Sequence, residues 1–546
     1  MARYARVRLL LALALITGCR QPAPAMPLPP MSHSAYAYYL DGKLAGHRDD
    51  WEAAAASLTE AAKLAPDQPM IVVELARALT KAKREPAARE ALAIARKRWP
   101  DHPEVWLASA ELSSAGEGIR AYRRAIELAP DDERGYLGLA KLESSAASEA
   151  TLRDLVERIP GSVDGHFRLA KHFLDRGDQA SAMRELHAVL ERDPDHIDAR
   201  LDLARALRRS GKIAQAIEQT RSAFDRSGQA LDLAEELYWL LCEADDRMAA
   251  IDLLTLLDDD RSDVEALVAV ARLQRGLGLL AEARAISARI AIVDPEAAAI
   301  LDAELAIPAD PAAAAQRLIA ISPGSARFAE ARRLAGEALF AAGDPRGAAA
   351  AVAPARERHP NNLDLAVLAA RARASSGDPA GARALVASLG SGLGPSLARA
   401  RVADHLGDVD GALAILEPVI RAHPDSITAL NLAGYLLADA NRRLPDAERW
   451  LRKARDLSPG DPAVLDSWGW LLLRKGETRA AIRALDRAAR FSPNEPEILV
   501  HLAAAWAADG APRTARTLLD RAALLHPSAA VQRRIDALRS TLPAPR

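Results

Sequence analysis

Prolines that recur at intervals of 34 residues divide most of this chain into units of similar length. Pro459, Pro493 and Pro527 are spaced in this way near one end, and Pro66 and Pro100 near the other. Between such prolines lie an apolar stretch, a turn that contains glycine, and a second apolar stretch rich in alanine. Proline lacks a backbone N–H and disfavours the helical conformation of the residue before it, so a helix ends there. The interval therefore predicts a chain of helix–turn–helix units.

The unit at 462–495 shows how one such repeat is built. A first helix is expected over about 463–474, and Gly476 ends it because glycine adopts the left-handed conformation that a helix stop requires. A second helix is expected over about 479–490, where alanine and leucine recur on one face. In the first helix, the small Gly469 lets the second helix approach closely. Such a unit cannot bury its apolar face alone, so it has to stack on its neighbours.

The same positions recur in other units, and together they resemble a known family. Two further copies carry Leu169, Ala170, Gly177, Ala182, Leu186 and Pro194, and Leu502, Ala503, Gly510, Ala515, Leu519 and Pro527. The pattern resembles the tetratricopeptide repeat, a helix–turn–helix unit of 34 residues. The resemblance implies an all-α fold, a right-handed superhelical α-solenoid of about fifteen repeats with a C-terminal capping helix. Runs that alternate like strands between turn signals are missing from the sequence.

A second signal lies at the N-terminus. Arg3, Arg6 and Arg8 precede a short apolar run at 9–16, which is too short to span a bilayer and indicates a signal peptide. The run ends in Ile16-Thr17-Gly18-Cys19, which resembles the bacterial lipobox. That resemblance implies cleavage before Cys19 and lipidation of this residue, and several acyl chains make a stable membrane anchor. The alternatives are a cytosolic protein with an apolar start and a secreted protein without lipid.

The residue after Cys19 bears on the destination of a lipoprotein. Arg20 is not the aspartate that retains lipoproteins at the inner membrane of enteric bacteria. By that analogy, the protein is expected in the cell envelope, anchored at the outer membrane and facing the periplasm. A proline-rich segment up to Met31 would form an extended tether between the anchor and the first repeat.

These signals and the regularity of the repeats predict six segments along the chain. The prolines are evenly spaced toward both ends and irregular in the middle, where the interpretation as a hinge stays open. The segments are a lipoprotein signal peptide at 1–18, the lipidated cysteine and tether at 19–33, an N-terminal repeat array at 34–228, degenerate repeats at 229–323, a C-terminal repeat array at 324–527, and a capping helix and tail at 528–546.

Composition and motifs exclude several classes of function. The 72 basic and 74 acidic residues nearly balance and form no basic stripe, so nucleic acid is not expected as a partner. Glycine-rich phosphate loops, His-Glu-x-x-His, nucleophile elbows and cysteine clusters are missing, so we expect no enzyme, no metal and no cofactor. Besides Cys19, the one cysteine is Cys242, which lies in an apolar run and is expected to be a buried core residue.

The resemblance also implies where a partner would bind. In tetratricopeptide arrays the first helices line the concave groove, and transferring that pattern places Asn431 and Tyr435 from one repeat beside Asp466 and Trp470 from the next. The two residues of each pair are four apart and share a helix face. Aromatic faces together with amide and carboxylate groups suit an extended peptide, and suit a glycan less well. The alternative is that Tyr435 and Trp470 serve packing between repeats.

Two hypotheses about function follow. The first is a membrane-anchored scaffold or adaptor that mediates protein–protein interactions in the bacterial envelope, as in assembly of an outer-membrane, pilus or secretion complex. The second is an accessory lipoprotein of exopolysaccharide synthesis or export. An enzyme would need sequence outside the repeats, and beyond the leader and tether there is almost none.

Overall fold

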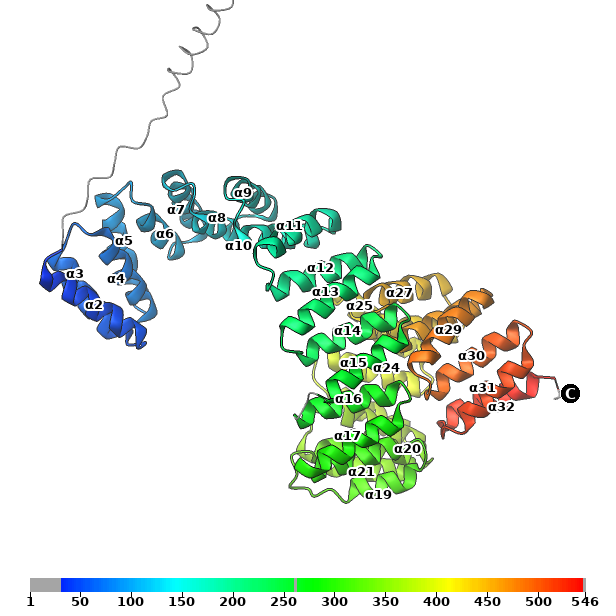
Figure 1. Ribbon diagram of the computed structural model, residues 1–546. Helices are drawn as coiled ribbons and strands as arrows, with labels where there is room; N and C mark the ends of the chain where they lie inside the picture. The colour runs from blue at the N-terminus through cyan, green and yellow to red at the C-terminus, as the bar shows by residue number, and fades with distance from the viewer. Residues whose placement is uncertain (1–30, 260–262, 544–546) are drawn as a thin grey trace, which may run out of the picture. The chain divides into compact units, whose positions relative to one another are not determined.

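A chain of paired helices makes up the protein. The structure, a computed structural model, describes residues 31–259 and 263–543. These residues form 31 α-helices, which are fifteen successive pairs followed by the single helix α32 (Figure 1), and they form no strand. The all-α solenoid of about fifteen repeats is thereby confirmed. We refer to the first helix of each pair as its A helix and to the second as its B helix.

The chain divides into two compact units, Met1–Ala206 and Leu207–Arg546, and the boundary falls inside α12. The described helices of the first unit are α2 (His33–His47), α3 (Trp51–Leu64), α4 (Pro69–Lys81), α5 (Glu85–Arg98), α6 (Pro103–Glu111), α7 (Ala115–Leu128), α8 (Glu133–Leu142), α9 (Ser145–Arg158), α10 (Val163–Asp175), α11 (Gln179–Arg192) and the start of α12 (Ile197–Arg209).

The second unit continues the same alternation of A and B helices. Its further helices are α13 (Ile213–Arg226), α14 (Leu231–Glu243), α15 (Arg247–Asp259), α16 (Val264–Gly276), α17 (Leu280–Val293), α18 (Pro295–Ala306), α19 (Pro311–Ile319), α20 (Phe328–Ala341), α21 (Pro345–Arg358), α22 (Leu363–Ser375), α23 (Pro379–Ala387), α24 (Leu393–His405), α25 (Val409–Ala422), α26 (Ile427–Asp439), α27 (Leu444–Leu457), α28 (Pro462–Arg474), α29 (Thr478–Phe491), α30 (Pro496–Ala508), α31 (Pro512–Ala523) and α32 (Ala529–Thr541).

The pair α28 and α29 shows why these residues form a repeat. Gly476 follows α28 with a φ of 81°, the left-handed conformation that ends a helix and that glycine adopts without a steric cost. A Cβ at Gly469 would lie 2.6 Å from Leu485 Cγ, so the missing side chain is what lets α29 pack against α28. Leu485 is fully buried in this contact. Both features match the expectation from the sequence.

The A helices within each unit lie side by side along the stack. Successive A helices contact each other directly, as α26 and α28 do, whereas each B helix packs mainly on the A helices before and after it. The surface on which a partner could meet several repeats at once is therefore made by A helices. No helix in the described ranges is both long enough and apolar enough to cross a membrane.

The irregular stretch at 229–323 folds as ordinary helix pairs, α14 to α19. Cys242 lies near the end of α14 and is fully buried, and its burial raises the pKa of the thiol to about 12. The thiol is thus neutral and part of the core, as expected from the apolar run around it. Within the second unit, these helices do more than connect the two regular arrays, because α14 and α16 contact repeats far along the chain.

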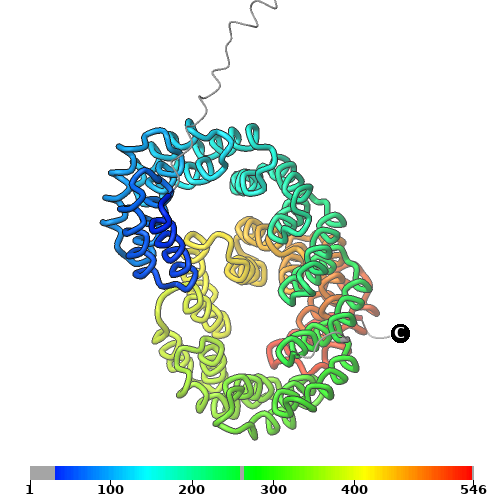
Figure 2. The backbone as a smooth tube through the Cα atoms, turned by 60° about the vertical axis from the view of Figure 1, so that its left-hand side comes forward, coloured from blue at the N-terminus to red at the C-terminus, as the bar shows by residue number. Residues whose placement is uncertain are grey.

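We call this contact the seam. One side is formed by the end of α14 and by the loops that follow α14 and α16. The other side is formed by α29 and by the loops that precede α28 and α30. Arg487 of α29 donates hydrogen bonds to the backbone oxygens of Cys242, at 2.9 Å, and Glu243, although the partners are some 245 residues apart. Arg490 pairs with Asp245 at 2.8 Å. The last carbonyls of a helix have no partner within it, so a guanidinium satisfies them well. Figure 2 shows the two segments, green and orange, side by side.

A glycine sets how closely the two sides of the seam approach. A Cβ at Gly460, before α28, would lie 2.5 Å from the backbone oxygen of Trp239 and 3.1 Å from the backbone nitrogen of Glu243. Both contact atoms belong to the backbone of α14, which cannot rotate away as a side chain does. The loop before α28 therefore packs on α14 backbone to backbone.

At the C-terminal end, α32 covers the last repeat. Ile535 of α32 is fully buried against α30 and α31, in a cluster with Leu499 and Leu519. The capping helix expected from the sequence is present.

Replacing Gly460 with alanine is expected to loosen the seam, because the new methyl group would collide with the α14 backbone. Amide hydrogen exchange should speed up in the last turn of α14, and the melting temperature should fall by roughly 2–4 °C, as for a loss of about 2 kcal/mol in a unit of this size. Gly390→Ala is the matched control, because a Cβ at Gly390 meets nothing within 4 Å. Equal exchange rates in the two variants would contradict a closed seam.

Candidate functional site

Two A helices of the second unit, α26 and α28, carry the residues that the sequence analysis placed in a groove. Ser426 caps α26, and its hydroxyl accepts a hydrogen bond from the Ala429 N–H at 3.4 Å. Asp461 caps α28, and its carboxylate accepts from the Ala463 N–H at 2.8 Å. Such caps satisfy N–H groups that the first turn of a helix leaves free.

Asp466 and Trp470 meet through a residue of the next A helix, His501 of α30. Both carboxylate oxygens of Asp466 lie within 3.0 Å of His501 Nδ1. The Trp470 ring stacks on the imidazole, with 4.2 Å between the ring centroids and 21° between the planes. His501 is fully buried. These two predicted residues therefore point into contacts between repeats.

Tyr435 joins the same group from α26. Its hydroxyl donates to Glu497 Oε1 at 3.1 Å and accepts from Arg534 at 3.0 Å. Arg534 of α32 also pairs with Asp439 at 3.0 Å, and Trp470 Nε1 donates to the same carboxylate at 3.1 Å. We call the connected set the C-terminal network. Its members are Tyr435, Asp439, Asp466, Trp470, Glu497, His501 and Arg534.

Four members of the network, Asp439, Glu497, His501 and Arg534, were not predicted from the sequence. The repeat spacing held no signal for them. Asn431 and Asp466 occupy equivalent positions, three residues before Gly434 and Gly469, but His501 lies one position further along its helix, two residues before Ala503. Arg534 reaches Tyr435 across the two intervening A helices.

Burial and neighbouring carboxylates control the charge of the network. Burial raises the pKa of the Tyr435 hydroxyl, and Glu497 and Asp439 raise it further, so the phenol stays protonated and donates. Asp404 of α24 responds in the same direction: burial raises its pKa, and the charges of Glu497 and Asp439 add to the effect. Arg534 supplies the positive charge that holds these acidic groups together.

Beside the network lies a hollow of about 670 Å³, which we call the central hollow. Asn431, Tyr435, Asp466 and Glu497 all contribute to its lining. Asn431 Oδ1 is buried and accepts a hydrogen bond from no donor in the described part of the chain. An amide oxygen left in this state costs about 1–3 kcal/mol, which a donor from a ligand would offset. Of the four predicted residues, Asn431 is thus the one whose side-chain oxygen has no hydrogen-bond donor among the described residues.

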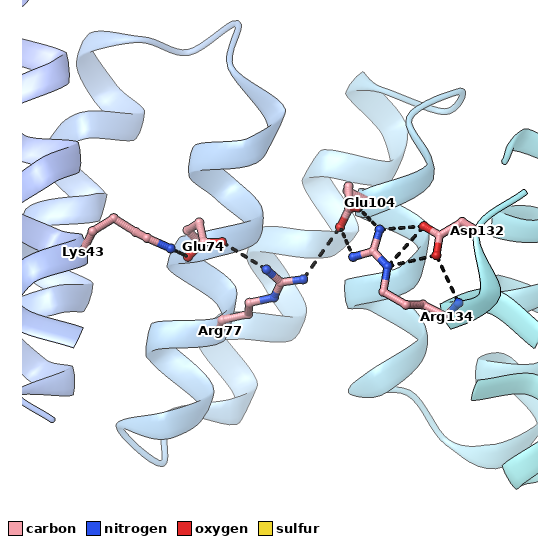
Figure 3. A network of polar contacts seen from close by, with 6 residues as sticks. All are labelled: Lys43, Glu74, Arg77, Glu104, Asp132 and Arg134. Atoms are coloured by element: carbon pink, nitrogen blue, oxygen red, sulfur yellow. Dashed lines mark hydrogen bonds and ion pairs between the residues drawn. The ribbon is translucent and has the colours of Figure 1, made fainter. Parts of the chain in front are cut away.

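The first unit carries a different polar arrangement, a ladder of ion pairs along its A helices (Figure 3). The pairs, in order along the unit, are Lys43–Glu74, Glu74–Arg77, Arg77–Glu104, Glu104–Arg134 and Arg134–Asp132. They join α2, α4, α6 and α8.

Partly exposed pairs of this kind contribute about 0–1 kcal/mol each. A hollow of about 520 Å³ between α2, α3 and α4 has Lys43, Glu74 and Arg77 on its rim. These charges neutralise each other, and the ladder links successive repeats.

The His501–Asp466 pair lies away from solvent. A histidine oriented by an aspartate resembles a general base, but the imidazole of His501 is shielded from solvent and stacked under Trp470. Within residues 31–259 and 263–543, no cluster of histidine, cysteine, aspartate or glutamate could hold a metal ion. The arrangement supports binding and rigidity.

Comparison with protein families gives the class of the chain. One tetratricopeptide repeat profile matches residues 47–112, 173–226 and 339–391, and a second matches 397–462 and 467–530. Together these stretches cover more than half of the sequence, and the chain belongs to the tetratricopeptide repeat family. The repeats indicate a scaffold for protein–protein interactions.

A relative, a TPR repeat-containing protein of Pseudomonas aeruginosa, is 40% identical over 87 residues, which are 16% of this chain and 15% of the relative. The solved structures of Naa15/Naa10 bound to HypK-THB and of the APC/C hetero-tetramer Cut9-Hcn1 are each 14% identical, cover 93% of this chain and 96% of theirs, and give a TM-score of 0.30. PilW, a type IV pilus biogenesis factor, is 18% identical over 35% of this chain and 93% of its own, with a TM-score of 0.28. At such scores the likeness carries no argument about shape or partners.

The buried His501–Asp466 pair predicts a pH dependence of stability. Burial opposes the charged imidazole and so does Arg534, but Asp466 and Glu497 favour it, and the net effect raises the pKa of His501 above 6.5. A raised folded-state pKa gives stability that is complete below about pH 6.5 and is lost as the pH rises through the folded value.

The difference in melting temperature between the unmodified protein and His501→Gln should therefore be larger at pH 6 than at pH 9. The exposed His359, changed to glutamine, serves as the control and should leave the pH profile unchanged. A difference that stays constant across this range would show that the pair does not titrate.

Proposed function

We propose that this protein is a membrane-anchored scaffold of the bacterial envelope, and that its second unit binds an extended peptide segment of a protein partner. The family supports the general role, because tetratricopeptide repeats indicate protein–protein interaction. The observation that carries the peptide site is Asn431, which lines the central hollow and whose buried amide oxygen has no donor among the described residues.

An extended peptide matches this chemistry. It presents a backbone N–H at each residue, and such a donor would satisfy the oxygen of Asn431 while the amide N–H₂ of the same side chain donates to a peptide carbonyl. The hydrogen bonds of Asn431 are made to the peptide backbone, so peptides of many sequences could form them. Selectivity for particular peptide side chains would come from the other residues that line the hollow. The C-terminal network supports the site by fixing Tyr435, which contributes to the same lining.

The anchor is proposed from the sequence alone, because Cys19 lies outside the described residues. The lipobox-like Ile16-Thr17-Gly18-Cys19 and the basic and apolar stretch before it support lipidation. With Arg20 after the cysteine, the outer membrane is the proposed site, with the repeats in the periplasm. Partners would then be envelope proteins, such as subunits of an outer-membrane, pilus or secretion complex.

Changing Asn431 to alanine is expected to weaken peptide binding by at least about tenfold, or 1.4 kcal/mol, because the backbone loses its hydrogen-bonding partner. Binding would be measured by fluorescence polarisation with peptides selected from a random 12-residue library on the detergent-solubilised full chain. Gln215→Ala, which removes an exposed amide from α13, is the matched control. Equal affinities of the Asn431 variant and the unmodified protein would argue against a peptide site here.

Changing Cys19 to serine is expected to abolish incorporation of radiolabelled palmitate and to move the protein from the membrane fraction to the soluble fraction. The reason is that the thiol is the acceptor for the diacylglyceryl group. Cys242→Ser is the matched control, because the sequence has only these two cysteines, and it should keep both label and membrane retention. Membrane retention of the Cys19 variant without label would refute the lipid anchor.

A further inference from the structure

The central hollow has a second wall, which the seam brings up from a distant part of the chain. One wall is made by α26, α28 and the start of α30, with Asn431 and Tyr435. The other is made by α14 and α16, with Tyr238, Trp239 and Leu273. A groove on an ordinary solenoid is open on one side, whereas here a bound segment would lie between two turns of the same unit.

Trp239 is the most unusual residue of the second wall. Its side chain borders the hollow, and 41% of the residue remains exposed, although large aromatic groups are normally covered. The neighbouring Tyr238 is buried and meets the indole edge to face, with 5.0 Å between the ring centroids and 78° between the planes. The backbone of Trp239 lies close to Gly460. Trp239 therefore adds a partly exposed aromatic group to the second wall.

Further groups in the hollow add apolar surface and charge. Ile498 and Leu273 contribute aliphatic surface from the two walls. Arg401 and Glu495 line the hollow as well, and neither forms an ion pair with a described residue. An aromatic group, aliphatic surface and an amide without an intramolecular donor match a peptide.

We infer that Trp239 is a binding residue of the central hollow, where it packs against an aromatic or large aliphatic side chain of an extended peptide while Asn431 bonds to the peptide backbone. This inference rests on the proposed function and specifies its ligand. Tryptophans that become buried at the centre of a protein interface contribute strongly to binding. In this arrangement α26 binds the backbone of the peptide, and α14 selects for one of its side chains.

The seam gives the site its spacing. Arg487 and Gly460 fix α14 against the loop before α28, so they set the distance between Trp239 and Asn431 without touching the peptide. A peptide in the hollow would therefore meet both walls at once.

The test uses the same random 12-residue library and the detergent-solubilised full chain. Selected peptides should be enriched in tryptophan, tyrosine, phenylalanine or leucine at one position. Trp239→Ala should weaken their binding by at least tenfold, while Trp239→Phe should retain most of it. Met248→Ala is the matched control, because Met248 is 66% exposed on the neighbouring α15 and does not line the hollow. Circular dichroism and melting temperature check that each variant is folded, and the bound peptide should protect Trp239 from hydroxyl-radical oxidation.

The outcomes separate this inference from the proposed function. Peptides that lose binding with Asn431→Ala but bind Trp239→Ala normally would keep the peptide site and overturn the role of Trp239. Peptides without an enriched apolar position would also overturn it. If no peptide binds, or if a soluble bacterial oligosaccharide binds instead in a Trp239-dependent way, the proposed peptide scaffold itself fails and the inference fails with it.

Discussion

The close approach of the two helices within each repeat is the contact on which the rest of the structure depends. Because Gly469 of α28 has no side chain, Leu485 of α29 packs directly against it, and the two helices form one layer. Such a layer still has apolar faces on both sides, which only neighbouring layers can cover. Stacking is therefore obligatory, and within each unit it brings successive A helices side by side, where the ladder of ion pairs and most of the C-terminal network lie.

Stacking alone would leave an open groove, and the seam changes that surface into a two-walled hollow. The arginines of α29 satisfy the carbonyls that end α14, and Gly460 allows backbone-to-backbone contact beside them. The C-terminal network has the complementary effect within one wall, because Arg534 ties α32 back to α26 through Tyr435 and Asp439. In both the seam and the C-terminal network, an arginine connects helices that are not neighbours in the order of the repeats. Both lie around the central hollow.

The repeat units and the A-helix positions of the site could be predicted from the sequence. Gly469 and Gly476 marked the helices of one repeat to within one or two residues. Asn431, Tyr435, Asp466 and Trp470 do lie on A helices, but three of them are engaged by His501, Glu497 and Arg534. Those hydrogen bonds and ring contacts depend on the rotation of each repeat relative to the next. This rotation is the result of many small packing angles, which a local sequence pattern does not predict.

By itself, then, the sequence determined the repeat, its helices and their register, because these follow from contacts between residues at most one period apart. Its N-terminal pattern supplied the hypothesis of a lipid anchor at Cys19. Only the tertiary structure decided that α14 meets α29, that Trp239 faces Asn431 across a hollow, and that α32 reaches α26. Such contacts span about 100 to 245 residues and arise from the accumulated turn of the solenoid.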